Sequence, residues 1–70
     1  MKNSLDKLHI ALYGGGQFQG YLKSVSIYHT KVTSTQNKSE AKAYAKRETA
    51  MKDVELVHVL THAGLTCEIV

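Results

Sequence analysis

ETAMKDVELVHVLTHAGLTCEIV, residues 48–70, is rich in large aliphatic side chains, so the other segments are expected to pack against it. Ala50, Val54 and Val57 recur at the spacing of one helical face. Alternate residues from Val54 to Leu60 are also apolar or half-apolar, which is a strand pattern, but the ending favours a helix. His62-Ala63-Gly64-Leu65 matches a helix stop, with the glycine in the left-handed conformation. The stretch therefore predicts a helix followed by a strand over Leu65–Val70.

The first half of the chain predicts a hairpin and a further extended run. Leu8–Tyr13 is rich in residues that favour strands, and Gly14-Gly15-Gly16 supplies the positive φ angles of a turn. The extended pattern then resumes over Phe18–Ser24 and continues over Val25–Thr33. Strands are usually about 5–6 residues long, so a break or bulge is expected near Lys23-Ser24. Residues Phe18–Thr33 could form one bent strand or two separate strands, and the sequence does not choose between them.

A polar segment, Ser34–Ser39, separates the strands from the helix. Asn37 or Ser39 is a suitable cap for a short helical segment over Glu40–Ala45. In one continuous helix, the apolar stripe of this segment would face away from Ala50, Val54 and Val57. We therefore expect a break at Lys46–Thr49.

These elements predict an α+β fold: a small antiparallel sheet in the order β-β-β-α-β, with one main helix on one face and a short helical turn before it. The 70 residues form one domain, and residues 1–6 are expected to be flexible. There is a single cysteine, and neither a signal peptide nor an 18-residue apolar span is present, so we expect a cytoplasmic protein without a membrane partner.

From about Gly20 onward, the chain resembles small accessory proteins encoded by temperate phages and prophages of Gram-positive, staphylococcal-type bacteria. The resemblance rests on YLKSVSIYHTKVTST, NKSEAKAY, ETAMKDVELVHVLTHAG and the terminal LTCEIV, about 50 of the 70 residues. It implies a phage accessory protein in the host cytoplasm and assigns no functional residue.

The candidate sites are few, and ordinary structural roles explain most of them. Gly14–Gly16 lacks the spacing of a phosphate-binding loop. His58 and His62 have the i, i+4 spacing that holds metals, but the HExxH motif is absent, and two exposed histidines are the simpler interpretation. Cys67 is expected to point inward as a small apolar group. No catalytic residue, metal or cofactor is predicted.

Charge divides the chain into two halves. Residues 1–47 contain eight Lys or Arg against two acidic residues, whereas residues 48–70 contain one Lys against four acidic residues. The main hypothesis is a non-enzymatic module that binds a host or phage protein through an open sheet face or edge, with self-association through the same surface left open. The alternative is nucleic-acid binding on the lysine- and tyrosine-rich sheet. Its candidate residues are Lys7, Tyr21, Lys23, Tyr28 and Lys31.

Overall fold

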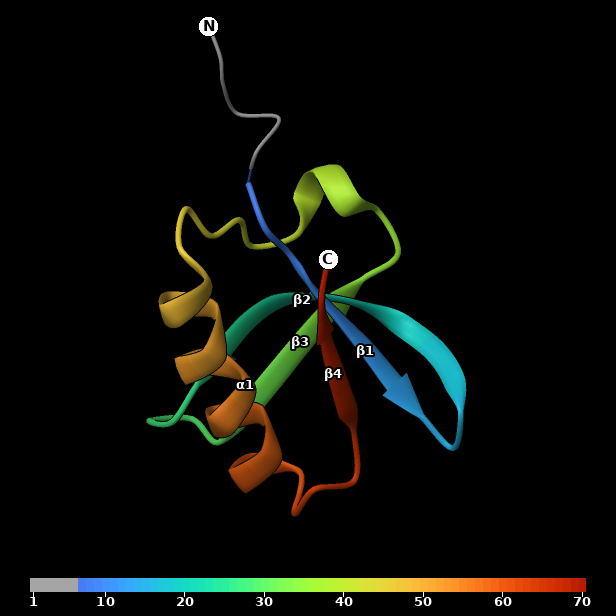
Figure 1. The fold of residues 1–70 in the computed structure, drawn as a ribbon. Coiled ribbons are helices and arrows are strands. Elements are labelled where there is room, and N and C mark those ends of the chain that lie inside the picture. The colour runs from blue at the N-terminus through green and yellow to red at the C-terminus, as the bar shows by residue number, and fades with distance from the viewer. Residues whose placement is uncertain (1–6) are drawn as a thin grey trace, which may run out of the picture.

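A four-stranded antiparallel sheet with an α-helix on one face makes up the computed structural model, which describes residues 7–70 (Figure 1). The strands lie in the order β3-β2-β1-β4, so β3 and β4 are the edges. This confirms the predicted α+β fold and its element order. The expected flexibility of residues 1–6 lies outside the described residues. The elements are β1 (Ile10–Gly14), β2 (Gln17–Ser26), β3 (Lys31–Thr35), the 3-10 helix η2 (Lys38–Glu40), α1 (Arg47–Leu60) and β4 (Thr66–Ile69).

The β1–β2 hairpin turns at Gly15 and Gly16, as predicted. Their φ angles are +60° and +81°, a combination that side chains disfavour at both positions. Opposite β1, the register of β2 slips by one residue between Gly20 and Phe18, which leaves Gln19 as an extra residue. Because of this bulge, Phe18 shares a sheet face with Tyr13.

The run from Phe18 to Thr33 forms two strands, and the turn lies later than expected. Residues 27–30 make the turn, in which the Thr30 N–H donates to the Ile27 carbonyl at 3.2 Å. The extended run predicted over Val25–Thr33 is therefore wrong at its centre. The expected irregularity near Lys23 is a bulge: Leu22 pairs with Ser34 and Ser24 with Thr33. The extra residue lets Leu22 and Val25, three positions apart, face the same side.

The predicted helix over Glu40–Ala45 is wrong. Asn37 does act as a cap, accepting from the Ser39 N–H at 3.1 Å, but the 3-10 turn ends at Glu40. The following segment, residues 41–45, instead forms backbone hydrogen bonds to β2 and to the residues just before β1. The Lys42 N–H donates to Leu22, and Tyr44 exchanges two hydrogen bonds with Leu8. These tertiary bonds replace the helical ones.

Helix α1 starts at Arg47, inside the break expected at Lys46–Thr49, and buries Ala50, Val54 and Val57 as predicted. It ends at Leu60, earlier than expected, and the left-handed residue that stops it is His62 (φ 55°), followed by Ala63 (φ 61°). The Ala63 N–H donates to the His58 carbonyl at 2.7 Å, which is the bond of a Schellman stop. The left-handed role predicted for Gly64 is therefore wrong.

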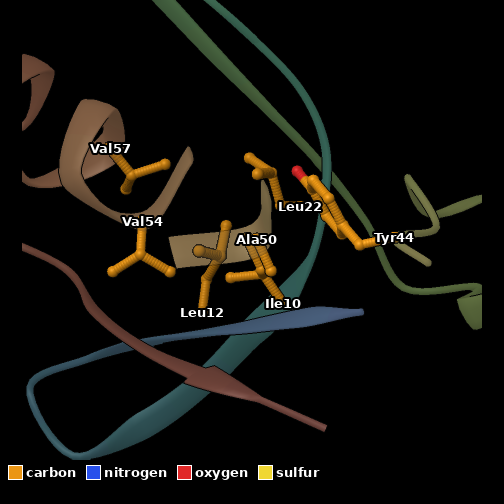
Figure 2. Close-up of a cluster of buried hydrophobic side chains, with 7 residues drawn as sticks. All are labelled: Ile10, Leu12, Leu22, Tyr44, Ala50, Val54 and Val57. Carbon is orange, nitrogen blue, oxygen red and sulfur yellow. The ribbon is translucent and has the colours of Figure 1, made fainter. Parts of the chain in front are cut away.

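The hydrophobic core lies between α1 and the sheet face that it covers (Figure 2). Its side chains come from three sources: the first two strands, the segment before the helix, and the helix. They are Ile10, Leu12, Leu22, Tyr44, Ala50, Val54 and Val57. Partly buried residues of β4, among them Cys67 and Ile69, extend this core toward the edge of the sheet.

Candidate functional site

A groove runs between α1 and the edge strand β4, and we call it the α1–β4 groove. Its volume is about 430 Å³. On the helix, the lining residues follow one stripe at intervals of three and four. On the strand, they follow the i, i+2 pattern of one face, with Glu68 between them. The lining is made by Arg47, Met51, Val54, His58, Cys67, Glu68 and Ile69.

Beside this groove, the backbone of β4 offers free hydrogen-bonding groups. Val70 exchanges both backbone bonds with His9, at 2.9 and 2.8 Å. In an antiparallel ladder such pairs alternate, so Glu68 bonds to Ala11 next, and Cys67 and Ile69 direct their N–H and C=O groups away from β1. No residue between 7 and 70 pairs with this side of β4. The strand therefore presents an open edge along the groove.

The floor of the groove is apolar and its rim is charged. Val54 is buried, Cys67 and Ile69 are half-buried, and Met51 exposes 45% of its surface. Arg47 and Glu68 contribute opposite formal charges. Within residues 7–70 the only ion pair joins Lys42 to Asp53, so neither rim charge is paired there. An extended segment with apolar side chains on one face and charges near its ends matches this lining.

Cys67 has the environment of a packing residue. Burial raises the pKa of its thiol, which disfavours the reactive thiolate. His58 lines the same groove, but no hydrogen bond joins it to Cys67 among the described residues. A nucleophile would need such a base within reach. The inward placement expected for Cys67 agrees with its packing against the core.

The two histidines with metal-like spacing do not share a helical face. His58 lies in the last turn of α1, whereas His62 follows the helix in the left-handed conformation. Within residues 7–70 there is no group of three or more His, Cys, Asp or Glu side chains placed to hold a metal. The described part of the chain therefore supplies no candidate metal centre.

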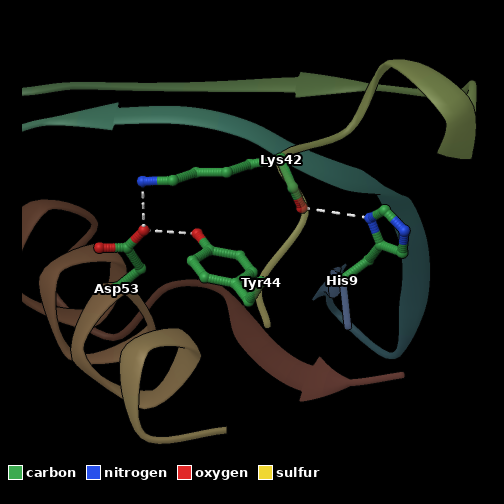
Figure 3. Close-up of polar contacts among 4 residues, drawn as sticks. All are labelled: His9, Lys42, Tyr44 and Asp53. Atoms are coloured by element: carbon green, nitrogen blue, oxygen red, sulfur yellow. Dashed lines mark hydrogen bonds and ion pairs between the residues drawn. The ribbon is translucent and has the colours of Figure 1, made fainter. Parts of the chain in front are cut away.

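A polar network fixes α1 on its other flank (Figure 3). Asp53 accepts hydrogen bonds from the Tyr44 hydroxyl and, at 2.8 Å, from Nζ of Lys42. Nδ1 of His9 lies 3.1 Å from the Lys42 carbonyl oxygen, and it donates to this oxygen in the tautomer that carries the hydrogen on Nδ1. Burial and the neighbouring Asp53 carboxylate raise the pKa of Tyr44 far above its ordinary value. The network holds the helix in place and leaves the flank along β4 free.

The sheet face opposite α1 has an aromatic cluster, which we define as Tyr13, Phe18 and Tyr21. Ring centroids are 5.7 Å apart between Tyr13 and Phe18 and 5.1 Å apart between Phe18 and Tyr21, both in edge-to-face orientation. Nζ of Lys38 lies 5.9 Å from the centre of the Tyr21 ring. Phe18 lies between the two tyrosine rings and exposes 42% of its surface.

The five residues predicted for nucleic-acid binding are spread over the molecule. Tyr21 belongs to the aromatic cluster, and Lys23 is exposed at the bulge of β2. Lys31 faces the same side as the cluster from the far end of β3, because it pairs with Ser26. Tyr28 lies in the turn beyond the sheet and is 94% exposed, while Lys7 precedes β1. The predicted set of five leaves out Tyr13, Phe18 and Lys38, which also belong to this face. Alternation could not place Phe18 here because of the bulge at Gln19.

Sequence reasoning also missed the groove residues Arg47 and Met51. Their helical spacing, continued by Val54 and His58, was readable as a stripe beside the core stripe. The missing information was which strand would lie next to that stripe. This depends on β4 taking the edge beside β1, which is a tertiary choice.

None of the helices within residues 7–70 has the length and apolar content needed to cross a membrane. Searches of protein-family models, curated proteins and solved structures found no match to this chain.

Proposed function

We propose that this protein is a non-enzymatic interaction module that binds an extended segment of a partner protein as an additional strand on β4. The resemblance to phage accessory proteins extends the proposal to a phage or host protein as that partner, in the cytoplasm of the host cell. The observation that carries it is the open backbone edge at Cys67 and Ile69, directly beside an apolar groove.

Strand addition uses both features together. Backbone bonds to Cys67 and Ile69 hold the added segment, and its alternate side chains point into the groove over Met51 and Val54. The other edge, β3, is a poorer candidate because its residues are lysine, serine, threonine and one valine, and charged edges resist pairing. The occupant we commit to is a segment of another protein, and a second copy of this chain is the alternative.

A neutral peptide tests the proposal. An acetylated and amidated peptide of sequence Thr-Thr-Val-Thr-Val-Thr is titrated into the isotope-labelled protein and followed by NMR. We expect saturable shifts at the amides of Cys67 and Ile69 and slower alkylation of the Cys67 thiol, because the peptide covers the groove. A peptide of the same composition with adjacent valines should bind more weakly, since only one valine then reaches the groove.

The variant Ile69→Pro is designed to prevent a further strand from pairing with β4. The Ile69 N–H points away from β1, so proline removes the outward donor without breaking a bond of the ladder. A thermal melt checks that the variant folds. Loss of the titration shifts supports the proposal, and equal peptide affinity in the folded variant contradicts it. Light scattering is expected to give a monomer; a dimer that excludes the peptide from β4 would make a second copy the occupant instead.

The aromatic cluster favours a second candidate function, single-stranded nucleic-acid binding. It combines a partly exposed ring, Phe18, with the ammonium group of Lys38 on a sheet face that α1 does not cover. Bases stack on such rings, and lysines neutralise phosphates. Binding of an oligonucleotide that weakens steeply with salt, and weakens further in Phe18→Ser, would support it. Absence of binding at low salt removes it.

A further inference from the structure

We propose that the segment bound in the α1–β4 groove runs antiparallel to β4, as all neighbouring strands of this sheet do, and places a carboxylate beside Arg47. This inference rests on the proposed function and names the chemistry of its ligand. It starts from the orientation of the two walls: α1 descends from Arg47 to Leu60, and β4 returns along it from Thr66 to Ile69 (Figure 1). Arg47 therefore marks the end of the groove at which β4 finishes.

Pairing geometry fixes which positions of the segment face the groove. An antiparallel strand that bonds to Cys67 and Ile69 places its residues opposite these two on the helix side. Those two positions meet the apolar floor and suit small aliphatic side chains. The residue opposite Glu68 faces the other side of the sheet.

In an antiparallel segment, the residue two positions before the one opposite Ile69 also faces the groove. It lies past Ile69, at the end of the groove where Arg47 is found. Arg47 has no ion-pair partner within residues 7–70, so its guanidinium is available to a carboxylate. An antiparallel segment brings an aspartate or glutamate near its N-terminal end to this position. A parallel segment would bring its C-terminal end there.

The pairing also predicts the charge of the segment residue that faces away from α1. The residue opposite Glu68 is expected to be basic or neutral, because two carboxylates directly opposite each other on one sheet face are unfavourable. The recognised pattern is therefore acidic, any residue, aliphatic, basic or polar, aliphatic. A segment of this pattern complements both unpaired rim charges of the groove.

The experiment compares two peptides on two proteins. Changing the first residue of the neutral peptide to aspartate, giving Asp-Thr-Val-Thr-Val-Thr, should tighten binding about three-fold, in the range of a partly exposed ion pair. Arg47→Gln should abolish this gain, so that the neutral and the aspartate peptide bind the variant with equal affinity. Lys52→Gln is the matched control: it removes the same charge from an exposed position of α1 outside the groove, and the gain should remain.

Binding direction is read from a spin label attached to the N-terminal end of the aspartate peptide. Relaxation enhancement at Arg47 and Val70 is expected, and enhancement centred on Thr66 and His58 would overturn the antiparallel assignment. Equal affinity of the two peptides for the unmodified protein would overturn the carboxylate assignment and leave strand addition standing. If neither peptide binds, the proposed function falls together with this inference.

Discussion

At the scale of single residues, Tyr44 links the irregular segment to both layers of the fold. The residue is 2% exposed and its ring belongs to the core, while its hydroxyl donates to Asp53 on α1. Its backbone meanwhile pairs with Leu8. A tyrosine is suited to this position because it buries a large apolar body and still satisfies a polar group at its tip.

Replacing Tyr44 with phenylalanine removes the hydroxyl and keeps the ring. The Asp53 carboxylate loses one of its two hydrogen-bond donors, so we expect the free energy of unfolding near pH 7 to fall by about 1–2 kcal/mol. Chemical unfolding followed by circular dichroism measures this loss. An unchanged stability would show that the bond to Asp53 contributes nothing net.

The same pair of proteins gives a pH prediction. Burial and Asp53 raise the pKa of Tyr44 in the folded state, so above the ordinary tyrosine pKa of about 10 only the unfolded chain loses this proton. The folded state then binds more protons than the unfolded state, and the contribution of Tyr44 to stability declines as pH rises. The stability difference between the original protein and Tyr44→Phe should shrink between pH 9 and pH 11, by at most about 1.4 kcal/mol per pH unit. A constant difference over this range contradicts the raised pKa.

At the scale of elements, the end of α1 shows that a glycine can matter without a positive φ. His62 occupies the left-handed position of the stop, and its N–H donates to the Val59 carbonyl at 3.3 Å. Gly64 lies two residues later, where an added Cβ would come 2.9 Å from the Thr61 carbonyl oxygen. The close approach of the backbone, rather than the sign of φ, excludes a side chain there.

Two substitutions with opposite expected signs test this assignment. His62→Gly should stabilise the protein by about 0.5–1 kcal/mol, because glycine adopts the left-handed conformation without the Cβ penalty. Gly64→Ala should destabilise it by about 1 kcal/mol or more through the contact with Thr61. Thermal unfolding measures both changes. Destabilisation by His62→Gly would contradict the assignment of His62 as the left-handed residue that ends α1.

At the scale of the whole molecule, the small core limits the stability. A single core in a chain of this size supplies roughly 3–5 kcal/mol of net stability. Ile10, Leu12, Leu22 and Val57 are its largest fully buried side chains. Each of these side chains therefore contributes a large share of the free energy of unfolding. A strand bound to β4 would raise that free energy, because it binds only the folded state.

Leu12→Ala should leave a substantial fraction of the protein unfolded at 25 °C. Leu12 is 1% exposed, and such truncations cost about 2–5 kcal/mol, which matches the whole stability expected for this chain. Val59→Ala, at a position that is 67% exposed on α1, should change stability by less than about 0.5 kcal/mol. Circular dichroism and denaturant titration of the two variants provide the comparison; a fully folded Leu12→Ala protein would mean that the site collapses around the missing side chain.

The elements whose causes are local could be predicted from the residues alone. Apolar spacing defined the face of α1 with Ala50, Val54 and Val57, the glycines of residues 14–16 located the hairpin, and Asn37 capped a turn. The mismatch between two apolar stripes correctly excluded one helix running on from residue 40, although α1 starts at Arg47, inside the predicted break. Side-chain spacing and backbone propensity act within a few residues, which is why these features were readable.

The features that depend on distant neighbours were fixed by long-range packing and strand pairing. The bulges at Gln19 and Lys23 exist because facing strands must keep their apolar residues over one core. Residues 41–45 gave up a locally plausible helix for bonds to Leu8 and Leu22. The α1–β4 groove required β4 to take the edge beside β1, and this pairing set which backbone groups stay free. Long-range pairing selects among local alternatives of similar energy, so no short stretch of sequence contains the answer.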